Sequence, residues 1–450
     1  MYDLIIIGSG PAGYVAAIRA AQLGMKTAII EKDRIGGMCL NWGCIPSKSI
    51  LESVKLFDKI KKDASKYGIE GIEKGDISFN WNKAVKRADL NVKKLTSGIE
   101  YLLKKNGSEI ITGSAKIIDK NTVSVENRQL EAKNIIIAIG STSTRIESNI
   151  EDLVIEPMDV FKERELPENI VVYGEGPVAI ELAQAYSLMG KKVSILLETN
   201  TFMPLADDYL SNYIQTKLKK DKIKIINNSS EISIKDNYKD GILRVNDEEI
   251  PCELIVNARN RMANSLDSDI EIVLENGFIK VDDNLQTSIE GIYAIGDVNG
   301  RSHFAHIASA EGLFVVNMLN GVKEKLDLSK FPMNMYSQPE AAQIGKTENE
   351  LKSMGVDYKI SEFPLSANGK ALTENSNEGF IRILSENQYG EVLGVQIVSN
   401  NATDMINEAS AYMQLESTVY DIAKTVHTHP TVSEVFMEAG FEAVDHAIHK

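Results

Sequence analysis

Short apolar runs alternate with glycine-rich turns in the first part of the chain. Residues 3–7 form an apolar run that predicts a fully buried strand. A glycine-rich turn follows, and the small residues from Tyr14 to Leu23 predict a helix that ends at Gly24. Another apolar run, Thr27 to Ile30, predicts a second buried strand ending at Glu31. This order of strand, helix and strand is typical of a parallel α/β sheet.

The first turn carries the spacing G-x-G-x-x-G. It consists of Gly8, Ser9, Gly10, Pro11, Ala12 and Gly13. Between a strand and a helix, such glycines let the backbone approach a pyrophosphate, whose charge the helix N-terminus stabilises. An acid at the end of the next strand, here Glu31, accepts hydrogen bonds from a ribose diol. The sequence therefore predicts a dinucleotide site at this turn.

The same pattern occurs a second time. A predicted strand, Asn169–Tyr173, leads into a turn that begins at Gly174, and a helix then runs to Leu188. The interval from Gly8 to Gly24 equals that from Gly174 to Gly190, and a strand over Val193–Leu197 follows. Two such motifs imply two dinucleotide sites, and an enzyme that holds two redox dinucleotides most simply moves electrons between them.

The other segments predict helices between the two motifs and a further domain after them. The expected helices are Ile50–Lys66 and Asn82–Asn106, and short strands then continue to about Ile139. From about Lys330 the strand patterns Gly379–Leu384 and Glu391–Val398 alternate with the helical patterns Glu348–Met354 and Ala402–Leu415. We therefore expect an α/β protein with two Rossmann-like dinucleotide-binding domains and a C-terminal α+β domain. The expected ranges are 1–145 with 265–330, then 146–264, and then 331–450.

Composition narrows the function classes. The chain has 450 residues, of which 43% are hydrophobic and 25% charged, which excludes a disordered or fibrous protein. No apolar window is long enough to cross a membrane, and residues 4–7 are too short for a secretory signal, so we expect a cytoplasmic protein. The net charge of −15 opposes binding to nucleic acid and suits a basic protein partner.

Cysteine usage points to redox chemistry. Three cysteines, Cys39, Cys44 and Cys252, are too few to staple a secreted scaffold. The close pair indicates catalysis or metal binding, and metal is the weaker option because no second pair completes a ligand set. If a helix begins near Cys44, its dipole favours a thiolate there, and the pair can close an easily reduced disulfide. The alternative is two buried cysteines without a redox role, and we interpret Cys252 as structural.

Several segments resemble a known family. They are GGMCLNWGCIPSK (36–48), GIYAIGDV (291–298), HFAHIASAEG (303–312), YSQPEAAQIGKTE (336–348), SANGKA (366–371) and HTHPTVSE (427–434). Together they resemble the flavoprotein disulfide reductases, and among these the dihydrolipoamide dehydrogenases, over the whole chain. The serine after GCIP and the SANGKA segment favour that group over the glutathione reductases. The C-terminus lacks the extra cysteines of the mercuric reductases.

The resemblance implies a homodimer that uses FAD and NAD, with NADP not excluded. It implies that Cys39 exchanges with the dithiol substrate and that the Cys44 thiolate contacts the flavin. His429 is the implied general base, oriented by Glu434 and placed across from the other subunit's disulfide. The implied substrate is a dihydrolipoyl group on a separate protein, of a 2-oxoacid dehydrogenase or a glycine cleavage system. The sequence leaves open which system this is, the direction of flux and the redox potential.

Further roles follow from the same resemblance. Lys48 lies near flavin N5 and pairs with Glu181, while Asp297 holds the ribitol. The other residues implied at the flavin are Lys32, Gly37, Met38, Ala115, Gly140, Ser141, Phe304, Ala305 and His306. Those implied at the nicotinamide dinucleotide are Gly174, Gly176, Ala179, Glu198 and Ala258.

The remaining histidines have less specific interpretations. Without its surrounding motif, His429 is more readily interpreted as a capping or core histidine than as a catalytic one. His427 is expected to support the site or the fold, and His303 and His306 to lie near the flavin without acid–base work. His446 and His449 are expected on a terminal amphipathic helix.

The second dinucleotide motif departs from the family pattern. Leu197 stands where the first motif has Glu31, and Glu198 follows one position later. Because adjacent strand residues face opposite sides, Glu198 reaches the same diol only if the strand has ended. Ala179 is typical of NADP users, yet no Arg or Lys follows the strand, and Glu175 adds a negative charge to the loop.

Two hypotheses follow for this motif: ordinary drift with nicotinamide binding retained, or weakened or altered nicotinamide use with another electron partner. The chain also replaces the family's VGRxPN with residues 257–264 and carries Met38, Ile139 and Lys370 at positions that usually hold other residues. Three other functions are considered: a related reductase for a different disulfide or NADPH, a non-catalytic FAD protein within a complex, and an electron carrier.

Overall fold

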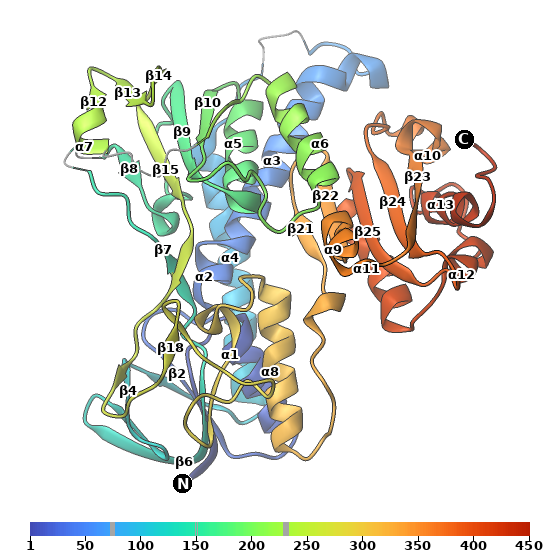
Figure 1. Ribbon diagram of the computed structural model, residues 1–450. Helices are drawn as coiled ribbons and strands as arrows, with labels where there is room; N and C mark the ends of the chain where they lie inside the picture. The colour runs from blue at the N-terminus through green and yellow to red at the C-terminus, as the bar shows by residue number, and fades with distance from the viewer. Residues whose placement is uncertain (73–76, 149, 151, 228–233) are drawn as a thin grey trace. The chain divides into compact units, whose positions relative to one another are not determined.

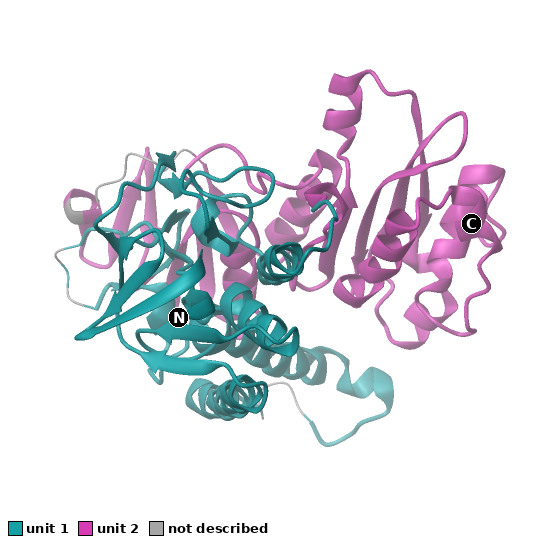
Figure 2. Ribbon diagram, turned by 90° about the horizontal axis from the view of Figure 1, so that it is seen from below, with its two compact units in different colours: residues 1–167, 256–326 teal, residues 168–255, 327–450 magenta. Residues whose placement is uncertain are grey.

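The computed structural model describes residues 1–450 except 73–76, 149, 151 and 228–233. Figure 1 shows the elements along the chain, which divides into the two compact units coloured separately in Figure 2. Unit 1 comprises residues 1–167 and 256–326, and unit 2 comprises residues 168–255 and 327–450.

Unit 1 is built on an eight-stranded sheet in which β20 pairs with β6 and the other strands run in the order β17-β4-β5-β6-β1-β2-β3. Its strands are β1 (Tyr2–Ile7), β2 (Thr27–Glu31), β3 (Glu109–Thr112), β4 (Ala115–Asp119), β5 (Thr122–Val125), β6 (Arg128–Ile137), β17 (Asp267–Ser268) and β20 (Ile292–Ala294). β1 pairs in parallel with β2 and β6, and its side chains at Leu4, Ile5 and Ile6 are fully buried. This burial on both faces explains why the strand is an uninterrupted apolar run.

The main helices of unit 1 are α1 (Pro11–Gln22), α2 (Gly37–Asn41), α3 (Cys44–Asp63), α4 (Trp81–Lys105) and α8 (Ala305–Leu319). Short 3-10 turns cover Ala64–Tyr67, Pro157–Asp159 and Gly296–Asn299, and short strands are β7 (Ser141–Ser143), β8 (Val154–Ile155), β16 (Arg261–Ala263), β18 (Leu274–Glu275) and β19 (Phe278–Ile279). α1 and α8 pack so closely that a Cβ at Gly312 would lie only 2.7 Å from the carbonyl oxygen of Ala12. Small residues therefore bring the N-terminal part of α1 against α8.

The first part of unit 2 repeats the strand–helix–strand pattern. Its elements are β9 (Asn169–Gly174), α5 (Gly176–Leu188), β10 (Lys192–Leu196), α6 (Asp208–Lys220), β11 (Lys224–Ile226), α7 (Ile234–Asn237), β12 (Tyr238–Lys239), β13 (Ile242–Val245), β14 (Glu248–Pro251) and β15 (Leu254–Ala258). β9, β10 and β11 are parallel neighbours, and β12, β13 and β14 form a separate antiparallel sheet. β15 lies next to β9 and leads across the boundary into unit 1 at Val256.

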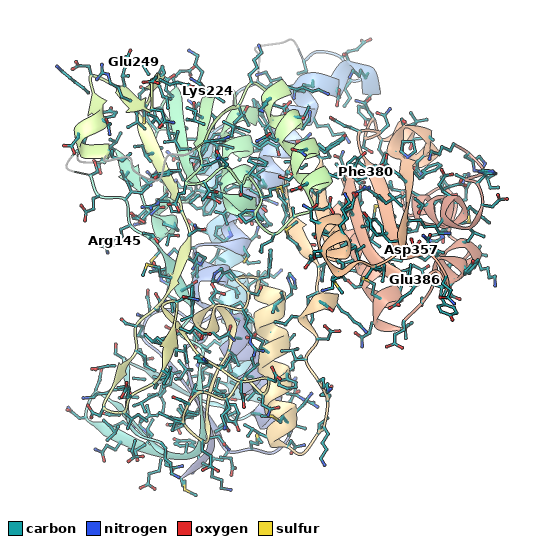
Figure 3. All side chains as sticks on the ribbon, viewed as in Figure 1. Arg145, Lys224, Glu249, Asp357, Phe380 and Glu386 are labelled. Carbon is teal, nitrogen blue, oxygen red and sulfur yellow. The ribbon has the colours of Figure 1, made fainter. Side chains whose placement is uncertain are left out.

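The second part of unit 2 is an antiparallel sheet in the order β21-β22-β25-β24-β23. Its strands are β21 (Met333–Met335), β22 (Glu340–Gly345), β23 (Tyr358–Pro364), β24 (Phe380–Glu386) and β25 (Val392–Ser399), and its helices are α9 (Glu348–Met354), α10 (Gly369–Thr373), α11 (Ala402–Gln414), α12 (Val419–Lys424) and α13 (Glu434–Val444). Short 3-10 turns cover Leu328–Lys330 and Leu365–Ala367. Phe363 and Phe436 are fully buried in its core, and Phe380 begins β24 (Figure 3).

The predicted fold class is confirmed. The helix predicted over Ile50–Lys66 corresponds to α3, which begins earlier, at Cys44, so the condition for a favoured thiolate there is met. One placement was wrong. α13 ends at Val444, so His446 and His449 lie beyond the last helix. His449 instead forms a hydrogen bond with Glu438, with 2.7 Å between Nδ1 and Oε1.

Candidate active site

The three glycines of the first dinucleotide motif are required for different reasons. A Cβ at Gly8, whose φ is +101°, would lie 2.3 Å from the carbonyl oxygen of Ala138, and one at Gly13 would lie 1.9 Å from the carbonyl oxygen of Gly8. These two positions are therefore fixed by packing. A Cβ at Gly10 would meet nothing within 4 Å. The open space at Gly10 lies at the N-terminus of α1, where a pyrophosphate fits, so the loop suits FAD.

Glu31 closes the same site. Ser9 donates to its Oε2 from the backbone N–H at 2.9 Å and from Oγ at 2.6 Å, and the N–H of Asp33 donates to Oε1 at 2.9 Å. The carboxylate is thereby held at the junction between the glycine loop and the end of β2. This is the position in which a carboxylate binds a ribose diol.

The cysteine segment is attached directly to this loop. The N–H of Gly36 donates to the carbonyl oxygen of Ser9 at 3.0 Å, and a Cβ at Gly37 would lie 2.9 Å from the Cα of Gly10. Cys39 lies in α2, and Cys44 is the first residue of α3. The cysteine segment, which follows the first motif in the sequence, thus also lies against the glycine loop of that motif in space.

Cys39 and Cys44 are both thiols in the structure, and their side chains are hydrogen-bonded. The hydrogen bond to Cys44 and burial raise the pKa of the Cys39 thiol, while the charge of Lys48 acts in the opposite direction. In such a coupled pair one proton leaves more easily than the other. Cys44 is favoured as the thiolate because it lies at a helix N-terminus and one turn before Lys48.

Asp297 lies in a cluster of polar side chains in unit 1. Its Oδ2 accepts from Ser141 Oγ at 2.5 Å and lies 3.3 Å from Arg261 Nε and 3.7 Å from His303 Nδ1. Burial opposes ionisation of this carboxyl, but the hydrogen bond with His303 and the charge of Arg261 outweigh it and lower the pKa of Asp297. Asp297 is thus a partly buried carboxylate acceptor, which is the property required for binding a ribitol hydroxyl.

Glu311 is a buried carboxyl next to this cluster. Its Oε2 accepts from the N–H of Gly296 at 2.6 Å and from Asn299 Nδ2 at 2.9 Å. Its Oε1 is buried and has no hydrogen-bond partner among the described residues. Burial raises the pKa of Glu311 to about 7. It fixes the backbone directly before Asp297. The sequence analysis missed Glu311, although the HFAHIASAEG segment contains it.

The remaining predicted flavin residues lie in unit 1. Ala115 begins β4, Gly140 has a positive φ of 71°, and Phe304 precedes α8, which begins at Ala305. Phe304 and His306 stack with ring centroids 5.4 Å apart. Lys32 is exposed after β2, and Met38 lies in α2. Arg261, which the sequence analysis did not single out, donates to Ser141 Oγ and to its carbonyl oxygen, both at 2.6 Å.

The predicted nicotinamide residues lie on β9, α5 and β15, or next to β10. Gly174 and Gly176 have positive φ values of 149° and 69°, and Ala179 and Ala258 are buried. Glu181 accepts from the N–H of Tyr336 at 3.0 Å. Lys48 lies in unit 1 and Glu181 in unit 2, so their pairing stays a prediction.

His429 and Glu434 are hydrogen-bonded in unit 2. His429 Nδ1 lies 2.9 Å from Glu434 Oε1, and Glu434 Oε2 accepts from the N–H of Thr431 at 2.8 Å. Burial opposes ionisation of Glu434, but the bonds with Thr431 and His429 lower its pKa. Because Nδ1 faces a carboxylate, it carries the proton, and Nε2 is left as the basic nitrogen. The His429 side chain is 80% exposed, so this base is accessible to another molecule.

His427 is a structural partner of this segment. Its side chain is 6% exposed, its Nε2 lies 2.7 Å from Glu408 Oε1, and its ring stacks on Phe436. The hydrogen bond with Glu408 raises the pKa of His427. A pocket of about 330 Å³ lies beside it, lined among others by Glu408, Pro430 and Thr431.

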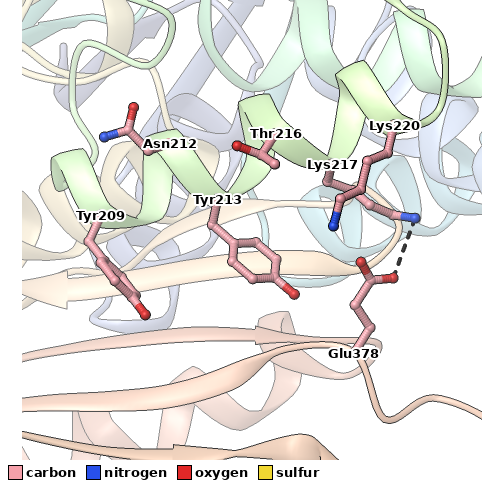
Figure 4. Close-up of a pocket in the computed structure, with 7 residues that line it drawn as sticks. All are labelled: Tyr209, Asn212, Tyr213, Thr216, Lys217, Lys220 and Glu378. Atoms are coloured by element: carbon pink, nitrogen blue, oxygen red, sulfur yellow. Dashed lines mark ion pairs between the residues drawn. The ribbon is translucent and has the colours of Figure 1, made fainter.

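A second pocket, of about 280 Å³, lies between α6 and the loop before β24 (Figure 4). Lys217, which lines this pocket together with Lys220, forms ion pairs with Glu378 at 3.3 Å and with Asp221 at 3.2 Å. The rings of Tyr209 and Tyr213 pack edge-on against Phe380. None of the predicted site residues lines this pocket.

Two absences concern only the part of the chain that the structure describes. Within it, no group of three or more His, Cys, Asp or Glu side chains is arranged to hold a metal ion. Likewise, none of the helices described there is long and apolar enough to cross a membrane.

A cysteine pair beside one dinucleotide loop, together with a second dinucleotide motif, defines a disulfide oxidoreductase. Comparison with known proteins agrees. Residues 2–312 match the model of the pyridine nucleotide-disulphide oxidoreductases, and residues 331–440 match the dimerisation domain of the same family. The chain belongs to the pyridine nucleotide-disulphide oxidoreductase family, whose members use FAD and NAD.

Its relatives cover the whole chain. The dihydrolipoyl dehydrogenase of Bacillus subtilis is 36% identical over 100% of this chain and 99% of its own length. That of Geobacillus stearothermophilus is 34% identical over 99% and 97%, and the mitochondrial dihydrolipoyl dehydrogenase 1 of Arabidopsis thaliana is 34% identical over 99% and 91%.

Two solved structures share the fold. LpdA from Mycobacterium tuberculosis superposes with a TM-score of 0.87 at 23% identity, covering 97% of this chain and 98% of its own. The HOCl-induced flavoprotein disulfide reductase RclA from Escherichia coli gives a TM-score of 0.85 at 23% identity with the same coverage.

Proposed function

We propose that this protein oxidises dihydrolipoyl groups to the lipoyl disulfide and reduces NAD⁺, as the names of its relatives suggest. The observation that carries the proposal is the Cys39–Cys44 pair at the start of α3, bonded through Gly36 to the loop that suits FAD. FAD, when bound, supplies the two-electron acceptor between the thiols and NAD⁺.

The residues of the chain divide the work of the reaction. His429 Nε2 takes the proton from a dihydrolipoyl thiol, and Glu434 stabilises the resulting imidazolium. The substrate thiolate attacks Cys39 of the Cys39–Cys44 disulfide, and Cys44 leaves as a thiolate. The second substrate thiol then attacks the mixed disulfide, so that lipoyl disulfide departs and Cys39 becomes a thiol. Lys48 and the start of α3 stabilise the Cys44 thiolate.

The active form is proposed to be a homodimer. The chain contains the dimerisation domain of its family at residues 331–440, and His429, 80% exposed, lies within it. We propose that His429 of one subunit serves the cysteine pair of the other. The substrate is a lipoyl-bearing protein, of a 2-oxoacid dehydrogenase or a glycine cleavage system, and the reaction takes place in the cytoplasm.

Anaerobic titration with dihydrolipoamide tests the proposal. The expected result is a long-wavelength charge-transfer band from the Cys44 thiolate and the flavin, which disappears when NAD⁺ reoxidises the protein. Glutathione serves as the comparison thiol. Purified protein that lacks flavin, or that reacts with glutathione as fast as with dihydrolipoamide, would contradict the proposal.

A further inference from the structure

The two dinucleotide motifs can be compared position by position, because Gly174 follows Gly8 by 166 positions and the pattern of glycines repeats. In this register, Ser9 corresponds to Glu175, Glu31 to Leu197 and Asp33 to Thr199. In the first motif, the strand-end carboxylate of Glu31 accepts from the N–H of Asp33 at 2.9 Å and from the loop residue Ser9. The carboxylate therefore joins the loop to the strand end.

In the second motif the strand-end position cannot carry out this role. Leu197 is fully buried, and its own N–H donates to the carbonyl oxygen of Ile226. The carboxylate instead comes from the loop. Glu175 Oε1 accepts from the N–H of Thr199 at 3.1 Å. Burial raises the pKa of Glu175, while the hydrogen bonds from the Thr199 and Glu198 backbone act in the opposite direction. The N–H of Thr199 is the equivalent of that of Asp33, so both motifs present a carboxylate to the same backbone donor.

We propose that Glu175 supplies the carboxylate that binds the adenosine ribose diol of NAD(H) and thereby selects NAD(H) over NADP(H). In the first motif the strand end supplies the carboxylate, whereas in the second motif the loop supplies it. In both motifs the carboxylate lies at the junction between the loop and the strand end. The 2′-phosphate of NADP(H) would face the charges of Glu175 and its neighbour Glu198, and the segment 198–202 contains no Lys or Arg. The inference rests on the proposed use of NAD⁺ and names the residue that recognises it.

Binding of NADH and NADPH to the purified holoprotein, measured by calorimetry, tests the inference. Glu175→Gln is expected to weaken NADH binding about 10- to 100-fold, since hydrogen bonds to a charged group are worth about 1.5–3 kcal/mol, and to improve NADPH binding relative to NADH. The double variant Glu175→Ser with Leu197→Glu rebuilds the arrangement of the first motif and is expected to restore the preference for NADH. Glu249→Gln, which removes an exposed carboxylate on β14, is the control for net charge (Figure 3).

The outcomes separate this inference from the proposed function. If the parent prefers NADH and Glu175→Gln leaves that preference intact, or if Glu198→Gln abolishes it instead, the assignment of Glu175 is wrong while the proposed function stands. If the parent binds neither dinucleotide, the nicotinamide half of the proposed function fails together with the inference. Flavin reduction by dihydrolipoamide then still reports on the cysteine pair.

Discussion

Replacing Gly13 by alanine should destabilise the fold, whereas replacing Gly10 by alanine should leave the fold intact and weaken flavin binding. A methyl group at Gly13 would lie 1.9 Å from the carbonyl oxygen of Gly8, so this contact must widen by about 1.5 Å to reach the 3.4 Å of ordinary packing. Overpacking of this kind costs about 1–3 kcal/mol, and here it involves backbone, which cannot rotate away. Gly13→Ala should therefore lower the free energy of unfolding.

Gly10→Ala should leave the fold intact. Gly10 has φ −64° and ψ −178°, which alanine adopts without strain, and its Cβ meets no atom within 4 Å. The unfolded chain loses conformational freedom, so the variant should unfold with a free energy equal to the parent's or higher by about 0.4–1 kcal/mol. The new methyl group, however, occupies the space proposed for the pyrophosphate, and a penalty of about 1–3 kcal/mol weakens FAD binding about 5- to 150-fold.

The assays are urea unfolding of the flavin-free protein and titration of that protein with FAD, followed by the quenching of flavin fluorescence. Gly24→Ala serves as a matched control, because a Cβ at Gly24 also meets nothing within 4 Å, although its positive φ of 83° strains alanine there. It should reduce stability without changing the affinity for FAD. If Gly10→Ala binds FAD as tightly as the parent, the open space at Gly10 is not the pyrophosphate site.

Three further predictions concern the charged and thiol groups. The pKa of Glu311, raised to about 7 from an ordinary 4.5, means that the folded protein retains a proton which the unfolded chain loses, so the free energy of unfolding should fall by about 3 kcal/mol between pH 4.5 and 7. Glu311→Gln should remove this decrease, and equal pH profiles of urea unfolding for parent and variant would exclude it. Glu434→Gln should slow turnover of dihydrolipoamide about 10- to 100-fold, because it removes part of the rate enhancement of ~10²–10⁴-fold that a general base provides. Reduction of the flavin by NADH, measured by stopped flow, should be unchanged. Cys44→Ser should abolish the charge-transfer band in the visible spectrum, whereas Cys39→Ser should keep it at neutral pH. The reverse result would mean that Cys39 is the thiolate at the flavin and Cys44 the thiol that exchanges with the substrate.

The spacing of the motifs predicted much of the fold, because glycine, proline and apolar runs act locally. It correctly predicted the strand over residues 3–7 and a helix after the cysteine pair, although that helix begins at Cys44 and not at Ile50. The dimerisation segment followed from the family resemblance and not from local spacing. The spacing could not determine which way Glu175 turns, since that depends on where β10 ends and on the backbone of Thr199. The position of Arg261 beside Ser141 and Asp297 also depends on pairing between β7 and β16, which are far apart in sequence.

The bond from Gly36 to Ser9 has a consequence for the biogenesis of this protein. The turn that carries the thiols is attached to the loop that receives the cofactor by contacts of the protein itself. A newly made chain that has not yet acquired its flavin therefore already holds its reactive sulfurs beside the empty loop. The thiol turn should thus be assembled before the cofactor arrives, and equal protease sensitivity of the segment 36–48 with and without FAD would show it.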